Sequence, residues 1–462
     1  MLAQWISWRL NILLRRSKKE DELITPQVER PLKLPELAGP HKNIGFVDVE
    51  WGDGQLYARL YYPSKEPVET PTKWIPYPDY MTAYGDFIRM PRLLSRTVTR
   101  VLVGAAEIPA GEALKPGING ACPLVIFSHG LGACRTTYSS ICTQLASFGY
   151  LVAAIEHRDG SACLTLTHEH QRKLPYEHAT GIAPYDPRQF SDEVAARGVG
   201  EHTWRNSQLH MRAKEMSSLL DALLLEPTQN QIDDDKSVVS LDVEDLLRIT
   251  WSPSGDKHFE ILRQFMSCIN RDRVYVAGHS FGGATAILSA TRNPRFKACL
   301  SLDPWMYPFE TDVESWFQRP FPLLIINSYT FQWAENLLAL RKLMDKLNVF
   351  DQTGVQMTLL GSTHQEFGDF PCLVSTRVLN FMRGHAGTIN PELAIYATVA
   401  AWRAFLGESK YEAESDSLWS KAEDAVDFLL RSDYHQAKEP KHLKVPVDEI
   451  FSLDHVVTAR HL

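Results

Sequence analysis

The sequence predicts an α/β fold in which a mostly parallel central sheet carries helices on both faces. The chain has 462 residues, 44% hydrophobic and 23% charged, so it can bury the core that such a sheet needs. From residue 122 onward, short apolar runs alternate with longer stretches of helical periodicity. Strands that are apolar on both sides indicate a sheet covered on both faces, and strand–helix alternation is typical of parallel strands.

Before residue 122, the elements follow from local patterns. Apolar and polar residues alternate on both sides of a Gly-Asp-Gly turn at 52–54, which predicts a β-hairpin over 46–62. Residues 63–91 are rich in proline and aromatic residues without periodicity, so an ordered loop is expected. Residues 92–103 combine an apolar stripe with three regularly spaced arginines and predict a helix. Its stripe either packs on the core, the more common arrangement, or lies on a membrane surface.

After residue 122, strands and helices alternate. Asn390 and Pro391 begin a last strong helix, which Gly407 ends, and a weaker helical pattern follows at 418–430. The expected strands are 124–127, 151–155, 274–277, 298–302, 323–327 and 356–360, and the other expected helices are 137–147, 204–225, 333–347 and one from residue 284.

Charge and cysteine usage exclude several classes of function. The net charge of −8 argues against nucleic acid as the main partner. The seven cysteines are odd in number and scattered, with no CxxC pair, which favours reduced intracellular thiols over a disulfide framework or a zinc site.

The most informative stretch is 273–290, which predicts a strand, a glycine-rich turn and a helix. Gly278 and Gly282 flank Ser280 with the GxSxG spacing of a nucleophile elbow. The glycines allow strand and helix to cross closely, and the helix N-terminus favours negative charge beside the serine. GxSxG alone also occurs in plain strand–turn–helix units, but its place between this strand and this helix favours the functional interpretation.

A serine nucleophile needs a histidine that takes its proton and a carboxylate that orients the histidine. In α/β-hydrolases the acid and then the histidine follow the serine along the chain, each after a later strand. Asp303 ends the strand after the elbow helix, and His364 follows the late strand at 356–360. The alternatives are a turn cap at Asp303 and a surface histidine at His364. The sequence therefore predicts Ser280 as nucleophile, Asp303 as orienting acid and His364 as general base and acid.

Two backbone N–H groups are expected to form an oxyanion hole. One belongs to Phe281, directly after the nucleophile, and the other to Leu131, in the loop after the strand 124–127. His129 and His157 each follow a strand and are expected to bond neighbouring backbone. Because the sequence shows no metal-ligand spacing of His, Asp or Glu, neither calcium, zinc nor any other cofactor is expected.

These residues stand in motifs that resemble the plasma and intracellular type II platelet-activating factor acetylhydrolases. The likeness runs from about residue 44 to 406, and the motifs occur in the same order. They are FSHGLG (127–132), VAAIEHRD (152–159), RAKE (212–215), GHSFGG (278–283), LDPWM (302–306) and GSTHQEF (361–367).

The resemblance implies an α/β-hydrolase fold and a calcium-independent serine hydrolase. Such enzymes release acetyl, short or oxidised acyl groups from the sn-2 position of phospholipids such as platelet-activating factor, through an acyl-serine intermediate. Carried over by position, the family's nucleophile, acid and base fall on Ser280, Asp303 and His364, and its oxyanion donors fall on Leu131 and Phe281. The family's two lipid-binding helices have similarly placed counterparts at 92–103 and near 373–382.

Three parts are expected along the chain: an N-terminal segment at 1–40, a catalytic domain at 41–407 and an acidic C-terminal extension at 408–462. Within the domain, 228–255 is acidic and is expected to be a surface insertion. In the N-terminal segment, tryptophans and leucines precede a basic cluster, the reverse of a secretory signal. This segment either lies on an anionic membrane surface or forms a disordered tail or a helix packed on the domain.

The expected function is therefore a cytoplasmic phospholipid esterase that contacts membranes peripherally. A first alternative is a general carboxylesterase or lipase of the same fold. A second is a non-catalytic scaffold, which the presence of all three expected catalytic residues disfavours.

Overall fold

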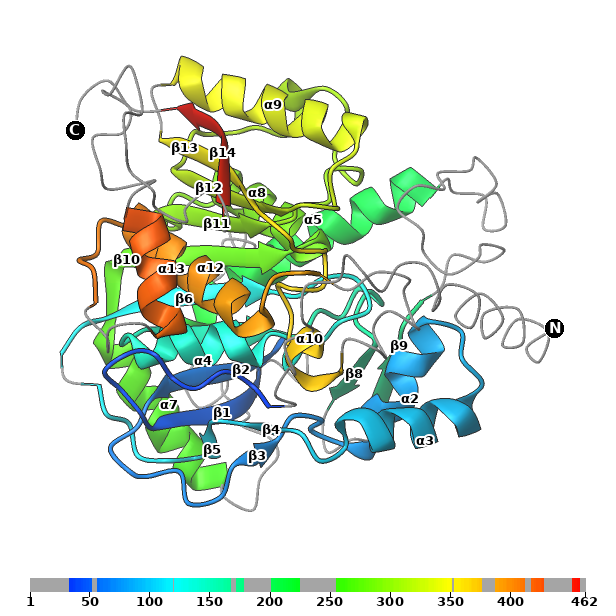
Figure 1. The fold of residues 1–462 in the computed structure, drawn as a ribbon, viewed down its shortest axis with the longest axis vertical. Helices are drawn as coiled ribbons and strands as arrows, with labels where there is room; N and C mark the ends of the chain where they lie inside the picture. Colours follow the sequence, from blue (N-terminus) through cyan, green and yellow to red (C-terminus); the bar gives the residue numbers. More distant parts are fainter. Residues whose placement is uncertain are drawn as a thin grey trace, which may run out of the picture. The chain divides into compact units, whose positions relative to one another are not determined.

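A ten-stranded sheet runs through the part of the chain that the structure describes (Figure 1). The computed structural model describes residues 33–51, 56–118, 120–167, 172–177, 201–224, 255–350, 353–375, 387–411, 417–427 and 451–457. The strands, in chain order, are β1 (Ile44–Trp51), β2 (Leu56–Pro63), β5 (Gly111–Glu112), β6 (Cys122–Ser128), β7 (Leu151–Ile155), β10 (Ile269–His279), β11 (Ala298–Leu302), β12 (Leu323–Ser328), β13 (Gly354–Leu359) and β14 (Phe451–Val457).

The middle of the sheet is parallel. Strands β13, β12, β11, β10, β6 and β7 lie side by side in that order and all pair in parallel. The predicted hairpin is confirmed as β1 and β2, which extend one side antiparallel, and β14 pairs antiparallel with β13 at the other edge. The predicted mostly parallel sheet is thus confirmed, with antiparallel strands towards its edges.

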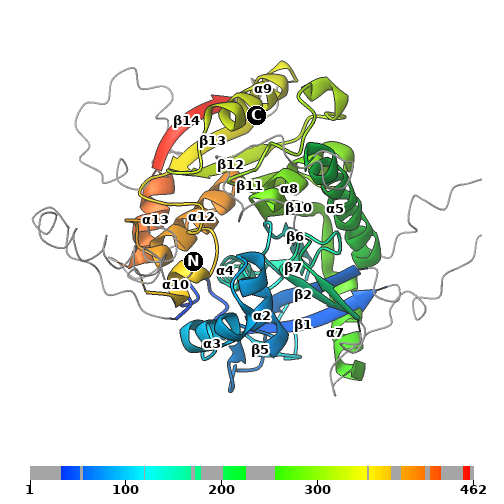
Figure 2. The ribbon, with the colours of Figure 1, turned by 90° about the vertical axis from the view of Figure 1, so that its right-hand side faces the viewer.

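Helices cover both faces of this sheet (Figure 2). The longer helices are α2 (Pro78–Phe87), α3 (Arg92–Val103), α4 (Ser139–Ser147), α5 (Glu201–Leu224), α7 (Gly255–Cys268), α8 (Phe281–Arg292), α9 (Ala334–Val349), α12 (Pro391–Phe405) and α13 (Leu418–Val426), with the short α10 at Phe370–Leu373. On β6, Val125 and Phe127 pack into the core beneath α4, α12 and α13, whereas Leu124 and Ile126 pack into the core beneath α5, α7, α8 and α9.

The expected loop at 63–91 is wrong over its second half, because residues 78–87 form α2. Pro78 stands in the first turn of this helix, where its missing N–H costs nothing, and Tyr80 and Ala83 are buried. Two short two-stranded sheets flank this region, β3 (Thr72–Lys73) with β4 (Glu107–Ile108), and β8 (Leu164–Thr167) with β9 (Arg172–Pro175).

The predicted helix at 92–103 is confirmed as α3, but its favoured orientation is wrong. Leu93 and Val101 are 86% and 78% exposed, whereas Ser95 is buried. The Ser95 hydroxyl donates to the Met81 carbonyl at 3.0 Å, and a Cβ on Gly85 would lie 1.8 Å from the Ser95 hydroxyl. Small residues therefore let α3 cross α2 closely, and much of the apolar stripe faces outward.

The predicted domain boundaries stay predictions, because much of 1–40, 228–255 and 408–462 lies outside the described residues. Within the described part, Leu34 is buried in the core, and the Gly39 N–H donates to the Ser147 hydroxyl at 3.0 Å. After residue 408, α13 packs against α12 and β14 joins the sheet. Among the described helices, none is long and apolar enough to cross a membrane.

Candidate active site

Ser280 lies in a tight turn between β10 and α8. It has a φ of 59°, a left-handed conformation that is uncommon outside glycine, and only 6% of the residue is exposed. A Cβ on Gly278 would lie 2.1 Å from the Gly282 carbonyl oxygen, and one on Gly282 would lie 2.0 Å from the Ser128 carbonyl oxygen. The predicted close crossing is confirmed, since no larger side chain fits at either glycine.

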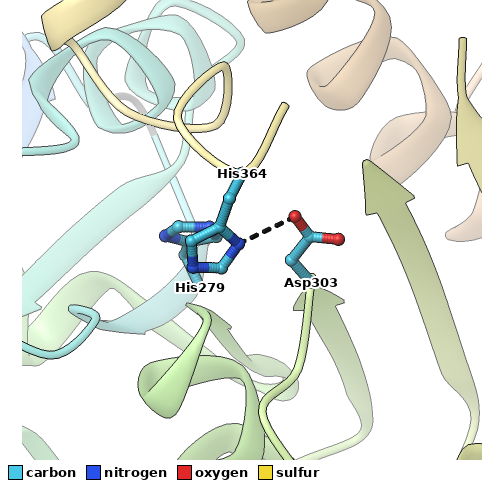
Figure 3. A group of neighbouring side chains, drawn as sticks. All are labelled: His279, Asp303 and His364. Atoms are coloured by element: carbon cyan, nitrogen blue, oxygen red, sulfur yellow. Dashed lines mark hydrogen bonds and ion pairs between the residues drawn. The ribbon is translucent and has the colours of Figure 1, made fainter. Parts of the chain in front are cut away.

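Asp303 and His364 are joined by a hydrogen bond (Figure 3). His364 Nδ1 lies 2.9 Å from Asp303 Oδ2, and the other carboxylate oxygen accepts from the Ser328 N–H at 2.5 Å. Phe331 stacks on the His364 ring, with centroids 3.7 Å apart. Ser328 and Phe331 were not predicted, because Ser328 ends β12 and Phe331 follows it, and this strand carries none of the expected catalytic residues.

Burial decides the acidity of this carboxyl. Asp303 is fully buried, and the desolvation of its carboxylate raises its pKa to about 7, against the opposing effect of the hydrogen bond from Ser328. Asp303 also has a left-handed φ of 42°. Strained backbone at a non-glycine residue is a feature that clusters at functional sites, and here it occurs at both Ser280 and Asp303.

His279 adds to the Asp303–His364 pair a third side chain that the sequence did not predict. Ligand atoms of His279, Asp303 and His364 lie within 4.8 Å of one another, close enough for a metal ion (Figure 3). However, the carboxylate of Asp303 already accepts from His364, and His279 Nδ1 lies 2.8 Å from the Tyr138 hydroxyl. This pairing fits a histidine oriented by a carboxylate, and the absence of a metal requirement stays a prediction.

The loop after β6 runs beside Ser280, and its backbone is held by side chains. A Cβ on Gly130 would lie 3.2 Å from the Ser280 Cβ. The Gly130 carbonyl accepts from His129 Nδ1 at 2.8 Å and from the Ala133 N–H at 3.3 Å. Because N–H and C=O point in opposite directions across a trans peptide, the Leu131 N–H points away from both donors. Phe281 begins α8, where backbone N–H groups have no partner within the helix.

His129 and His157, both expected to bond neighbouring backbone, differ in their partners. His129 bonds the neighbouring backbone as predicted, because its Nδ1 reaches the Gly130 carbonyl and its Nε2 accepts from the His157 N–H. For His157 the prediction is wrong, since its ring bonds the Ser128 hydroxyl at 2.7 Å and the Glu215 carboxylate at 2.5 Å. Glu215 lies on α5, so no local pattern around His157 indicates this contact.

A cavity of about 300 Å³ opens beside Ser280, His364 and Leu131. Its wall is largely apolar and includes α2 and α3, from the region partly expected to be a loop. The wall residues from these two helices and from α10 include Tyr84, Phe87, Val98, Leu102 and Phe370.

The sheet topology explains why these segments meet. Strand β6 pairs with β7 on one side and with β10 on the other, so the order of the strands reverses there. Ligands of open α/β sheets bind at the carboxyl ends of the strands, at such a switch point. Leu131, Ser280, Asp303 and His364 follow β6, β10, β11 and β13, all at this edge.

Comparisons with known proteins agree with this geometry. A model of the family described as platelet-activating factor acetylhydrolase, isoform II, matches residues 27–428. The platelet-activating factor acetylhydrolase of Gallus gallus is 32% identical over 438 residues, which cover 92% of this chain and 96% of the relative. The platelet-activating factor acetylhydrolase of Bos taurus is 32% identical over 377 residues, which cover 81% of this chain and 76% of that relative. The chain belongs to the platelet-activating factor acetylhydrolase family.

More distant matches support the fold. A putative phospholipase A2 of Schizosaccharomyces pombe is 26% identical over 367 residues, which cover 71% of this chain and 77% of that protein. A solved ferulic acid esterase from Streptomyces cinnamoneus aligns with a TM-score of 0.53 at 17% identity, over 92% of this chain and 99% of the esterase. Together with the sheet, these matches confirm the expected α/β-hydrolase fold, and family membership confirms the expected carboxylic ester hydrolase.

Proposed function

We propose that this member of the acetylhydrolase family is a calcium-independent serine esterase of phospholipids. It releases acetyl, short or oxidised acyl groups from the sn-2 position of substrates such as platelet-activating factor. The observation that carries this proposal is the joint placement of Ser280 and the Asp303–His364 pair. Ser280 and His364 line one largely apolar cavity, and Asp303 bonds the far side of the histidine.

In this mechanism His364 takes the proton of Ser280 as the serine attacks the sn-2 carbonyl. Asp303 holds the proton on Nδ1 of His364, so that the lone pair of Nε2 acts as the base. His364 then protonates the leaving lyso-phospholipid, and water clears the acyl group from Ser280. The N–H groups of Leu131 and Phe281 stabilise the negative charge on the carbonyl oxygen.

The cavity supports the preference for short acyl groups. Its wall is largely apolar and includes Tyr84, Phe87 and Phe370, and its volume of about 300 Å³ is at the lower end of the usual range for ligand pockets. In an apolar pocket one methylene changes the binding free energy by about 1–3 kcal/mol, so a small apolar pocket discriminates between acyl chains of different length.

Peripheral contact with membranes from a cytoplasmic location is also part of the proposal. Exposed Leu93 and Val101 on α3 lie on the same helix as Val98 and Leu102, which line the cavity. A lipid surface at α3 would therefore lie close to the cavity. The second expected contact, near 373–382, has less support, because Leu373 is buried and residues 376–386 lie outside the described part of the chain.

The first test is hydrolysis of phosphatidylcholines whose sn-2 chain runs from acetyl to palmitoyl, with a chelator present and Ser280→Ala as control. We expect a steep fall in kcat/KM with chain length, no effect of the chelator, and a loss of about 10⁴-fold or more in Ser280→Ala. A flat profile would favour a general carboxylesterase. Full turnover by Ser280→Ala would rule out the serine mechanism.

A further inference from the structure

Arg212, from the RAKE motif on α5, has no role in the reaction as proposed above. Its side chain is fully buried beneath the loop that carries Leu131, with Asp159 Oδ2 at 3.4 Å. Desolvation lowers the pKa of Arg212 to about 10. Burying a guanidinium costs several kcal/mol that a single ion pair only partly offsets, so its contacts merit a functional explanation.

The guanidinium contacts both segments that carry the proposed oxyanion donors. Nη2 donates to the His129 carbonyl at 2.7 Å, in the loop that leads to Leu131. Nη1 donates to the Thr285 hydroxyl at 3.2 Å, and that hydroxyl donates to the Phe281 carbonyl at 2.8 Å. The guanidinium also lies over the Phe281 ring, 4.4 Å from its centroid. One side chain thus links the loop after β6 to the first turn of α8.

The contact with the loop fixes the peptide unit next to the donor. The His129 carbonyl is held by Arg212, and the N–H of the same peptide, from Gly130, donates to the Tyr138 hydroxyl at 3.1 Å. Rotation of this peptide would break both bonds and change the direction of the Leu131 N–H that follows. Since a displacement of about 1 Å can slow a reaction about 10²-fold, the orientation of this unit matters for catalysis.

We propose that Arg212 is a positioning residue that holds the Leu131 and Phe281 N–H groups in one geometry, so that they bind the same oxyanion. An arginine suits this role because its planar fork donates in several fixed directions at once, whereas a lysine is a point charge on a flexible stem. The inference rests on the proposed serine esterase mechanism and adds to it the residue that aligns the oxyanion hole.

The test compares Arg212→Met with a matched control, Arg205→Met. Arg205 is also buried on α5, but it bonds Gln208 and Tyr176 and lies over Trp204. Three quantities are measured: kcat and KM for 4-nitrophenyl acetate, affinity for a trifluoromethyl ketone that forms a tetrahedral adduct with the serine, and affinity for an unreactive ether analogue of the substrate.

For Arg212→Met we expect kcat to fall about 10²-fold with little change in KM. Affinity for the ketone should fall by a similar factor and affinity for the ether analogue should not change, because only the adduct carries the oxyanion. In Arg205→Met all three quantities should stay near the wild-type values. A wild-type kcat in Arg212→Met, or a lower kcat with undiminished ketone affinity, overturns the inference.

A second variant covers the case in which Arg212→Met does not fold. Thr285→Val keeps the shape of the side chain but removes the link between Arg212 and the Phe281 carbonyl, so kcat and ketone affinity should fall together. Unchanged kcat in a folded Thr285→Val overturns the inference. A wild-type protein without esterase activity would instead refute the proposed function itself, so the two failures are distinguishable.

Discussion

At the scale of single residues, the Asp303–His364 hydrogen bond ties activity to pH. Hydrolysis by the proposed mechanism needs Asp303 ionised, because only the charged carboxylate stabilises the imidazolium that His364 forms when it takes the serine proton. Burial raises the pKa of Asp303 to about 7, well above the value of about 3.9 for an aspartate in an unfolded chain. The ionised form is thus reached only near neutral pH.

We therefore expect kcat/KM to rise with pH through about 7, because Asp303 loses its proton there. The measurement is a pH–rate profile with a short-chain phosphatidylcholine. Asp303→Asn should lower kcat on the order of 10⁴-fold, since the amide favours the wrong tautomer of His364. A profile that is already flat below pH 5 would contradict this assignment.

The pH dependence of the unfolding free energy tests the raised pKa of Asp303 independently of activity. The raised pKa means that the folded state holds the proton more tightly than the unfolded chain does, so this group stabilises the fold at low pH. That contribution is lost as the pH rises from about 4 through about 7. The unfolding free energy of Asp303→Asn relative to the wild type should therefore increase over this range. The opposite trend would indicate a carboxylate that is stabilised by its partners.

At the scale of elements, helices α2 and α3 form a wall of the cavity and carry an exposed apolar surface. Burial of Ser95 against Gly85 sets the distance between the two helices and turns Leu93 and Val101 outward. Because α3 also lines the cavity through Val98 and Leu102, its position affects both access for lipid and the shape of the pocket.

Leu93→Ser with Val101→Ser is expected to weaken binding to vesicles of phosphatidylcholine and phosphatidylserine about tenfold or more. Burial of one large apolar side chain contributes about 1.5–3 kcal/mol, and both residues are free to enter the lipid surface. Sedimentation with vesicles measures the binding. Leu338→Ser, at a 56% exposed leucine on α9, is the matched control and should bind as the wild type does. Equal binding by all variants would exclude docking through α3.

At the scale of the whole molecule, the described residues after 408 take part in the main structure. Strand β14 adds to the edge of the sheet beside β13, and α13 packs on α12. Trp419 of α13 is buried, with Phe148 and Tyr396 around its ring at centroid distances of 4.8 and 5.7 Å. The helix thus closes the core at the carboxyl end of α4.

Trp419→Ala should lower the free energy of unfolding by about 3–5 kcal/mol, because it leaves a large cavity in this core. The folded fraction should keep its kcat/KM, since Trp419 does not line the catalytic cavity. Urea unfolding measures the change, with Leu338→Ala expected within about 0.5 kcal/mol of the wild type. A loss below about 1 kcal/mol would mean that α13 contributes little to the stability of the core.

The sequence by itself determined the parallel sheet, the elbow and the family. Apolar runs of strand length and the glycines around Ser280 are local signals, since backbone and burial requirements act on neighbouring residues. The order of serine, acid and histidine along the chain is also visible without a structure. It pointed to Asp303 and His364, whose hydrogen bond the structure contains.

Only the tertiary structure decided which residues surround that site. Arg212, Tyr138, Ser328 and Phe331 reach it from three separate segments, and nothing in their local patterns indicates a common target. The outward face of α3 likewise depends on Gly85 of another helix. Contacts between segments far apart in sequence depend on packing in three dimensions. The periodicity of apolar residues shows which side chains are apolar, but it does not show which residues they contact.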